Sequence, residues 1–416
     1  MVDDKLSRIT ALRPASSVMG GRIPSPGHSP SSTNRLLELL DAQCRSNRCG
    51  EHITVRRKFP EPRVCQVTPQ ALRLLAPEAA SELSDPHRWL FLDTETTGLA
   101  GGTGTYAFLV GIAWWEDDGL VVEQFFMRNH AEEASLLAEL SGILAQRRPL
   151  VTFNGKSFDW PLLETRYRMC RIGAIACPSA HLDLLHPARQ LYRLKLKSVA
   201  LAELEKHILS LERGYDIPSE SIPGRYFDFL RGGPAEPVAE IFHHNQMDLR
   251  GLAALAVHIT GLLQQPESAE CGSAELYGIS RLLQRRGENE LACITYKRAL
   301  SGDLPEAAGR SAKRELALNA KRQGLFDRAN RLWEELAEDE NAGPEAREHL
   351  AIYYEHEARD LHRAVSLTRQ ALVKLRAAAS SGKISSHIYR QWHARFQHRM
   401  NRLEFKLESI QGRQGC

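Results

Sequence analysis

Apolar and polar positions follow two different patterns and divide the chain into a mixed middle part and a helical last part. In the middle part, short apolar runs bounded by turn-forming residues predict strands at residues 89–94, 106–115, 121–127 and 150–153. Apolar residues that recur with helical spacing predict helices at residues 132–146, 159–169 and 238–263. Hairpin-joined strands followed by alternating helix and strand are typical of a mixed α/β sheet flanked by helices. We place this domain at residues 86–265.

The last part of the chain contains an internal repeat. Ala292, Ala329 and Ala364 each follow a turn-forming stretch at a similar offset, and they are 37 and 35 residues apart. This spacing is close to the ~34-residue period of tetratricopeptide helix pairs, in which small residues let paired helices approach. The pattern therefore predicts an all-α tetratricopeptide-like helical repeat domain at residues 272–380, which is a candidate surface for a protein partner. Residues 381–416 are predicted to form a basic amphipathic helix that caps the repeats, with nucleic-acid contact as the alternative.

The first part of the chain has two segments of different character. Residues 1–35 are rich in Ser, Pro and Gly, so we expect a disordered tail, because such a segment cannot bury enough apolar surface to fold alone. Residues 36–85 combine a short helical pattern with an extended run at residues 53–57. We expect this lead-in segment to pack on the domain that follows.

Composition narrows the class of protein without naming a partner. A chain of 416 residues has room for two or three domains, and a net charge of +3 is too small to indicate an acidic or basic partner. Any affinity for nucleic acid must therefore come from a local basic patch. The eight cysteines are scattered without a C-x-x-C pair, which favours reduced thiols over zinc or disulfides. Since no apolar run approaches a membrane span, we predict a cytoplasmic protein with no membrane contact.

Two carboxylates stand two residues apart, Asp93 and Glu95, at the end of the first strand of the middle part. Alternate side chains of a strand share a face, so both would point into the same space. Two like charges repel at that distance unless a cation lies between them, and oxygen ligands suit Mg²⁺ or Mn²⁺. The pair therefore indicates a metal site, although acidic residues are also common at the ends of edge strands.

Two further carboxylates are candidates for the same site. Asp159 follows a strand that turns through an Asn-Gly pair into a helix, at the end of the sheet where open α/β folds build their sites. The alternative is that it only complements the helix dipole. Asp248 lies on the last predicted helix of the domain. His244 is one turn earlier on the same helical face, and His243 is rotated farther round.

Three segments taken together resemble the exonuclease motifs of the DEDD superfamily, whose fold is that of ribonuclease H. They are Asp93-Thr-Glu95, Asn154-Gly-Lys-Ser-Phe-Asp159 and His244-Asn-Gln-Met-Asp248. More narrowly, the chain from about residue 89 to residue 263 is similar to the YprB-type ribonuclease-H-like domain, which often carries such a C-terminal repeat region. The segments at 101–106, 181–185 and 216–223 take part in this resemblance.

The resemblance implies two-metal hydrolysis of phosphodiester bonds, and we expect a 3′–5′ exonuclease that acts on single-stranded DNA or RNA ends. Asp93, Glu95, Asp159 and Asp248 would hold two Mg²⁺ or Mn²⁺ ions roughly 3.5 to 4 Å apart. The competing hypothesis is an interaction scaffold that binds nucleic acid without cutting it. Four intact carboxylates favour the enzyme, because a binding domain has no use for mutually repelling acids.

The resemblance also implies a neutral histidine that takes the proton of the attacking water. Superfamily members usually place this histidine five residues before the last aspartate, which selects His243. The His-Asn pair of the YprB-type domain selects His244 instead, and we favour His244.

Substrate contacts are expected from a separate set of residues around the motifs: Thr96, Asn154, Lys156 and Arg193. Arg193 belongs to a basic stretch with Arg189, Lys195 and Lys197. This stretch is either a solvated helix face or an edge that holds the phosphates of an incoming strand. Asp183 is either an outer partner of the site or a structural carboxylate.

Overall fold

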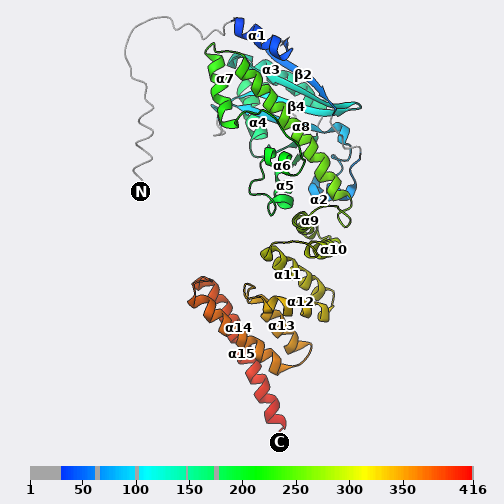
Figure 1. Cartoon of the computed structure of the whole chain (residues 1–416), viewed down its shortest axis with the longest axis vertical. Coiled ribbons are helices and arrows are strands. Elements are labelled where there is room, and N and C mark those ends of the chain that lie inside the picture. The colour runs from blue at the N-terminus through cyan, green and yellow to red at the C-terminus, as the bar shows by residue number, and fades with distance from the viewer. Residues whose placement is uncertain (1–29, 61–65, 99–102, 147–148, 173–177, 415–416) are drawn as a thin grey trace, which may run out of the picture.

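The computed structural model of the chain describes residues 30–60, 66–98, 103–146, 149–172 and 178–414. These residues form a seven-stranded mixed sheet with helices packed on it, followed by a stack of paired helices that ends at the C-terminus (Figure 1). The predicted fold class is therefore confirmed. None of the helices within these ranges combines the length and the apolar character that crossing a lipid bilayer requires.

The sheet has the strand order β1-β2-β5-β4-β3-β6-β7. Its strands are β1 (Gln43–Asn47), β2 (Gly50–Phe59), β3 (Leu90–Thr96), β4 (Ala107–Glu116), β5 (Gly119–Phe126), β6 (Pro149–Thr152) and β7 (Ala180–Asp183). In this spatial order, neighbouring strands from β1 through β5 and β4 to β3 pair antiparallel, and β6 pairs parallel with both β3 and β7. Phe91 on β3 belongs to one hydrophobic core, and Leu90 and Leu92 belong to another. The central strand is thus covered on both faces, as its continuous apolar run predicts.

The lead-in segment is part of this sheet and does not only pack against it. Strand β2 pairs with β5 from Ile53 opposite Phe126 to Phe59 opposite Leu120, and β1 closes a hairpin on β2. A domain boundary at residue 86 would cut through a continuous sheet. Pairing between strands so far apart in sequence depends on buried residues such as Ile53 and Val55, and no local pattern shows which edge they join.

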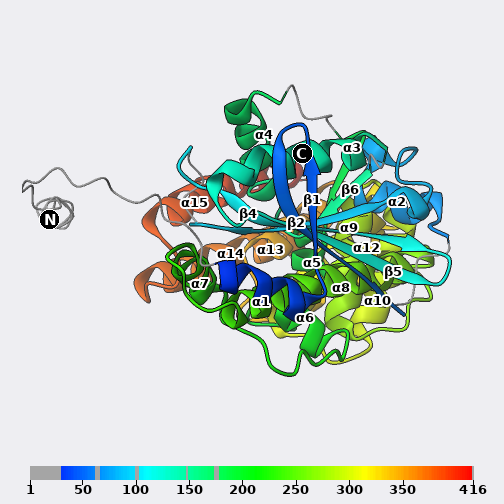
Figure 2. The same ribbon diagram turned by 90° about the horizontal axis from the view of Figure 1, so that it is seen from above.

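Eight helices accompany the sheet in the described ranges before residue 265. They are α1 (Pro30–Leu40), α2 (Pro69–Leu75), α3 (Glu133–Gln146), α4 (Asp159–Cys170), α5 (Leu185–Tyr192), α6 (Leu201–His207), α7 (Ile222–Leu230) and α8 (Glu236–Gln264). Short 3₁₀ turns lie at Pro77–Ala79, Pro86–Arg88, His130–Glu132 and Ser219–Ser221. Helix α8 packs against β3, β4 and β5 and crosses the sheet (Figures 1 and 2).

Helix α1 corrects the predicted disordered tail at its inner end. Residues 1–29 of that tail lie outside the described residues, but α1 begins at Pro30. Leu36 and Leu40 are buried in a core shared with the first turns of α8. Leucines at this spacing bury one helical face, and this packing outweighs the polar Ser and Thr residues that open the helix.

The last part of the described chain consists of α9 (Ser273–Arg285), α10 (Asn289–Leu300), α11 (Glu306–Arg322), α12 (Phe326–Glu338), α13 (Glu345–His356), α14 (Leu361–Ser380) and α15 (Ser386–Gln414). Successive helices pack as pairs, and the repeated alanines Ala292, Ala329 and Ala364 are buried on the second helix of each pair. A residue with positive φ follows the first helix of each pair, namely Gly287, Gly324 and Arg359. The internal repeat in the sequence is therefore a repeat of helix pairs.

The first pair is packed directly on the sheet domain. A methyl group at Gly278 of α9 would lie 2.5 Å from the carbonyl oxygen of Gln190 and 2.7 Å from Cα of Leu191 on α5. Beside this crossing, Nζ of Lys195 lies 2.6 Å from Oε1 of the buried Glu275. One hydrophobic core contains residues of both α5 and α9. The two helices therefore form a close, fixed junction.

Candidate functional site

Asp93 is held in place by an amide that reaches across the sheet from α8. Nδ2 of Asn245 donates a hydrogen bond to Oδ2 of Asp93 at 2.8 Å, and Nε2 of Gln124 donates to Oδ1 of Asn245 at 2.8 Å. Asp93, Gly111 and Gln124 lie opposite one another on β3, β4 and β5. The missing side chain of Gly111 leaves the space over which the buried Asn245 extends. The orientation of the Asp93 carboxylate is thus fixed by two successive hydrogen bonds.

Glu95 lies two residues farther along β3, which puts it on the same face as Asp93. It is buried, although β3 ends one residue later. The neighbouring Thr96 uses its hydroxyl to donate to the carbonyl of Gly98 at 3.0 Å. This hydrogen bond ties down the turn after the strand.

Asp159 begins α4, and a tight turn after β6 carries it to the carboxylates. Oγ1 of Thr94 donates a hydrogen bond to Oδ1 of Asp159 at 2.5 Å. The turn itself is fixed by Asp183, whose carboxylate accepts backbone N–H groups of Asn154, Lys156 and Leu185. Asp183 is therefore a structural carboxylate that shapes the turn. The turn also needs Asn154, with a φ of 69°, in the left-handed region that asparagine tolerates.

Asp248 and His244 come from α8, one helical turn apart. Nε2 of His244 lies 3.6 Å from Oδ2 of Asp248 and 4.0 Å from Oε1 of Glu95. Ligand atoms of Glu95, His244 and Asp248 all lie within 4.8 Å of one another, so these three residues form a group that could hold a metal ion. His243 is exposed, whereas His244 is buried. The structure thus brings His244 to the carboxylates.

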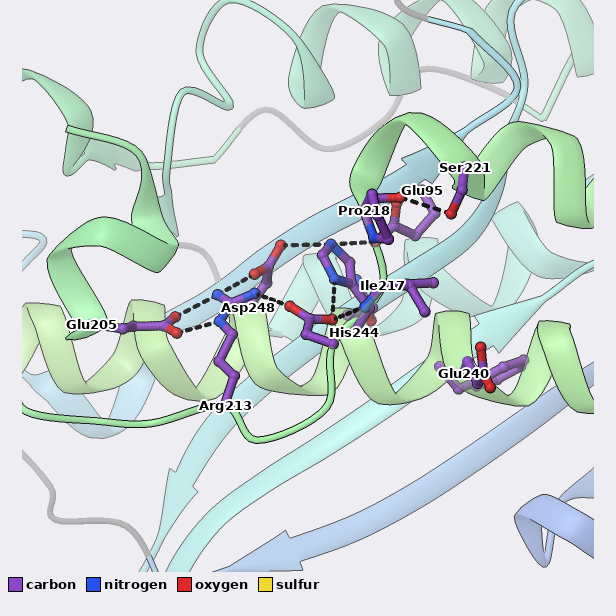
Figure 3. A network of polar contacts seen from close by, with 12 residues as sticks. Glu95, Glu205, Arg213, Ile217, Pro218, Ser221, Glu240, His244 and Asp248 are labelled. Carbon is purple, nitrogen blue, oxygen red and sulfur yellow. Dashed lines mark hydrogen bonds and ion pairs between the residues drawn. The ribbon is translucent and has the colours of Figure 1, made fainter. Parts of the chain in front are cut away.

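A loop between α6 and α7 supplies two residues that the sequence analysis did not assign to the site. Oδ1 of Asp216 lies 2.7 Å from Nδ1 of His244, and Oδ2 of Asp216 accepts from Nη1 of Arg213 at 2.9 Å. Nη2 of Arg213 donates to Oδ1 of Asp248 at 2.5 Å and to Oε1 of the buried Glu205 at 2.6 Å. Figure 3 shows part of this network, with Arg213 between Glu205 and Asp248 and His244 beside Asp248. One loop therefore contacts both His244 and Asp248 of α8.

Only part of this arrangement has a signal in the sequence. Asp216 stands at the start of the segment 216–223 that takes part in the family resemblance, but nothing local indicates that it contacts a histidine. Asn245 is the second residue of the His-Asn pair. Arg213 has no recognisable motif, because its three acidic partners come from α6, from its own loop and from α8.

The site carries an excess of negative charge, and the pKa values of several of its carboxyl groups are raised. Burial and the nearby carboxylates of Asp248 and Asp159 raise the pKa of both Asp93 and Glu95 well above the usual range. Burial raises the pKa of Asp159 to about 6, although its hydrogen bond from Thr94 acts in the opposite direction. Burial also favours protonation of Asp216, but hydrogen bonds from His244 and Arg213 outweigh it and lower the pKa of that carboxyl. Cations other than Arg213 would relieve the remaining repulsion.

A cleft of about 720 Å³ opens beside the carboxylates and is lined by Asp93 and Asp248. Of the residues expected to contact substrate, Asn154 and Arg193 line the cleft. Lys156 is exposed and does not contribute to its lining. Arg189 and Lys197 are on the lining as well, so basic and acidic side chains share one cleft.

Comparison with known proteins identifies sequence relatives of the chain. Residues 90–260 match a family model described as the RNase_H superfamily. Over 285 residues the chain is 32% identical to a protein of Bacillus subtilis (strain 168) named "Uncharacterized protein YprB", and the aligned region covers 68% of each chain.

A structural match was also found to the family B DNA polymerase from the hyperthermophilic archaeon Pyrobaculum calidifontis. Its TM-score is 0.34 and its sequence identity 13%, and it covers 66% of this chain. The chain spans about a third of that polymerase, with 34% of the polymerase chain covered. The family assignment rests on the two sequence matches: the protein is a homologue of YprB, and its residues 90–260 form a domain of the RNase_H superfamily.

Proposed function

We propose that the protein is a metal-dependent nuclease, a 3′–5′ exonuclease that hydrolyses phosphodiester bonds at single-stranded DNA or RNA ends. The observation that carries this proposal is the convergence of Asp93, Glu95, Asp159 and Asp248 from β3, α4 and α8 beside one cleft. Burying like charges together costs free energy unless cations accompany them. The raised pKa values of Asp93 and Glu95 express this cost.

The donor set fits hard divalent cations such as Mg²⁺ or Mn²⁺, which prefer carboxylate oxygens. A protein donor orients one oxygen of each aspartate: Asn245 on Asp93, Thr94 on Asp159 and Arg213 on Asp248. A carboxylate has two oxygens, so each oriented aspartate can offer the other to a cation. Together with Glu95 these residues would hold two ions. When bound, two such ions activate a water for attack and stabilise the leaving oxygen.

His244 is the residue that we assign as general base. Its Nδ1 faces the carboxylate of Asp216, which can only accept a hydrogen bond. The ring proton therefore lies on Nδ1, and Nε2 is left as the basic nitrogen. Nε2 faces Glu95 and Asp248, where the attacking water would be bound. The exposed position of His243 gives it no comparable partner among the described residues.

The paired helices support a second part of the proposal, a tetratricopeptide-like module for a protein partner. The period of the buried alanines and the positive φ at the end of each first helix favour this assignment. It can be checked by superposing the pairs α9–α10, α11–α12 and α13–α14 in an experimental structure. Pairs that do not share one geometry would contradict it.

The nuclease is tested with purified protein, Mn²⁺ and end-labelled substrates. Matched single-stranded, duplex and overhang forms of DNA and RNA would be compared, with chelator as a control. We expect stepwise shortening of single strands from the 3′ end, lost in chelator and in Asp93→Ala. Asp228→Asn is the matched control, because Asp228 is an exposed acid of α7 that pairs with Arg231. Binding without cutting, equal in chelator and Mn²⁺, would instead indicate a nucleic-acid-binding scaffold.

A further inference from the structure

The cleft that Asp93 and Asp248 line also has basic side chains on its lining. Arg189 lies on α5, and Arg193 and Lys197 follow on the segment after it; all three side chains are exposed and line the cleft. None of them forms an ion pair with an acid in the described part of the chain. Lys195, in the same stretch, is different, because it is paired with Glu275 of α9 at 2.6 Å. Three of the four cations in this stretch are therefore available to a ligand in the cleft.

The spacing of these cations suits a repeating anionic ligand. The N–H of Arg193 donates to the carbonyl of Arg189 at 3.3 Å, so these two residues, four apart, share one helical face at roughly 6 Å along the axis. Lys197 comes four residues later, just beyond the last helical turn. The backbone keeps helical hydrogen bonds up to Leu196, whose N–H donates to the carbonyl of Tyr192 at 2.8 Å. Successive phosphates of an extended nucleic-acid strand repeat over a similar distance. A row of this kind contacts phosphates without reading bases.

The size of the cleft favours a single strand over a duplex. Its volume of about 720 Å³ has room for a short length of one strand, but not for the two strands and grooves of a double helix. The acidic side chains of Asp93 and Asp248 on the same cleft would repel phosphates. The basic side chains on the same lining offset this repulsion.

The basic stretch is also rigidly supported. Gly278 of α9 crosses α5 so closely that its missing side chain is what permits the contact with Gln190 and Leu191. Lys195 fastens the same segment to Glu275. The positions of Arg189 and Arg193 are therefore set by the first helix pair as well as by the sheet domain.

We propose that Arg189, Arg193 and Lys197 form a phosphate track that holds the single strand on its way to the carboxylates. The proposal rests on the proposed nuclease function for the direction of travel, but the binding itself is independent of cutting. Recognition through phosphates makes affinity dependent on salt and nearly independent of base composition.

Fluorescence anisotropy with labelled oligothymidylate and oligoadenylate tests the track, in chelator and over a series of salt concentrations. The variants are Arg189→Gln, Arg193→Gln and Lys197→Gln, singly and combined. Lys206→Gln is the matched control, since Lys206 is an exposed lysine of the neighbouring helix α6 that does not line the cleft. Thermal unfolding of each variant shows that the fold is intact.

We expect each single variant to bind several-fold more weakly, and the slope of log affinity against log salt to become shallower by about 0.7 per removed contact. The control should match the wild type, and both oligonucleotides should bind alike. Wild-type affinity and salt slope in the triple variant would overturn the track, even if the wild-type enzyme cuts. Weakened binding in the triple variant, with no cutting by the wild type in Mn²⁺, would leave the track standing and reject the nuclease. A wild type that binds neither oligonucleotide would overturn the track outright.

Discussion

Gly111 lies so close to Asn245 that a methyl group added to the glycine would overlap the amide oxygen and lie 2.8 Å from Cγ of Asn245. The amide passes over the glycine on its way from Gln124 to Asp93. A residue without a side chain on β4 therefore determines how a carboxylate on β3 is oriented.

Gly111→Ala is expected to displace Asn245 and free the carboxylate of Asp93. We predict that overpacking lowers the free energy of unfolding by about 1–3 kcal/mol. Nuclease activity should fall by a larger fraction of its wild-type value. Urea unfolding and single-strand digestion would measure the two effects. The control is Gly142→Ala on α3, where an added methyl group meets no atom within 4 Å. A Gly111→Ala variant as active as the wild type would show that the orientation of Asn245 does not matter.

Asp216→Ala is expected to leave His244 without the partner that fixes its ring. We predict that kcat falls about 10- to 100-fold, while KM changes little, because Asp216 does not line the cleft. Asp216→Asn keeps an oxygen that can accept from Nδ1 and should recover part of the activity. Equal loss in both variants, or a loss confined to KM, would argue against this positioning role.

The metal and pH should act together on stability. Asp93, Glu95 and Asp159 have raised pKa values in the fold, that of Asp159 being about 6. An acid with a raised pKa holds its proton more tightly when folded, so the metal-free protein loses stability as pH rises through these values. Divalent cations bind the deprotonated carboxylates and cancel this loss. We expect Mn²⁺ to raise Tm little at about pH 4.5 and clearly at about pH 8, measured by thermal unfolding against a chelator control.

Acids outside the metal site affect this measurement differently. Glu355 has a lowered pKa, so its stabilising contribution is lost as pH falls. Glu355 lies far along the chain on α13, and its effect should be the same with and without Mn²⁺. Only the difference between the two conditions reports on the site. A Mn²⁺ effect that does not grow with pH would contradict binding to these carboxylates.

Gly278→Ala tests the junction between α5 and the first helix pair. The added methyl group meets backbone atoms, which cannot rotate away, so we predict a loss of about 1–3 kcal/mol together with weaker binding of single strands. Gly309→Ala on α11 is the control, because its methyl group would meet only a side chain at 3.9 Å. Unfolding in urea and oligonucleotide binding would be measured for both. Unchanged stability in Gly278→Ala would show that α5 and α9 can move apart at this junction without cost.

The strands and helices that carry the acids could be predicted because each has a strong local pattern. The apolar run before Asp93 and the helical period around Asp248 both determine the face on which the carboxylate lies. The helix pairs were equally visible, since the same turn and alanine recur in sequence. These features depend on residues close together in the chain.

The parts that the sequence did not show depend on contacts between distant segments. Arg213 meets Asp248 across 35 residues, and Asn245 meets Asp93 across 152. Strand β2 joins β5 through a pairing that no turn specifies, and β1 forms the edge of the sheet beyond it. Periodicity describes a face of an element, but it does not identify the partner on the other side.

The loop from Arg213 to Asp216 links the groups of the site into one unit. Its arginine holds Asp248 and its aspartate holds His244, so a substitution in either changes the surroundings of both. Effects of substitutions at these four positions should therefore not be additive. A variant library that changes one of them at a time would overestimate the importance of each, and only paired substitutions would divide the effect correctly among them.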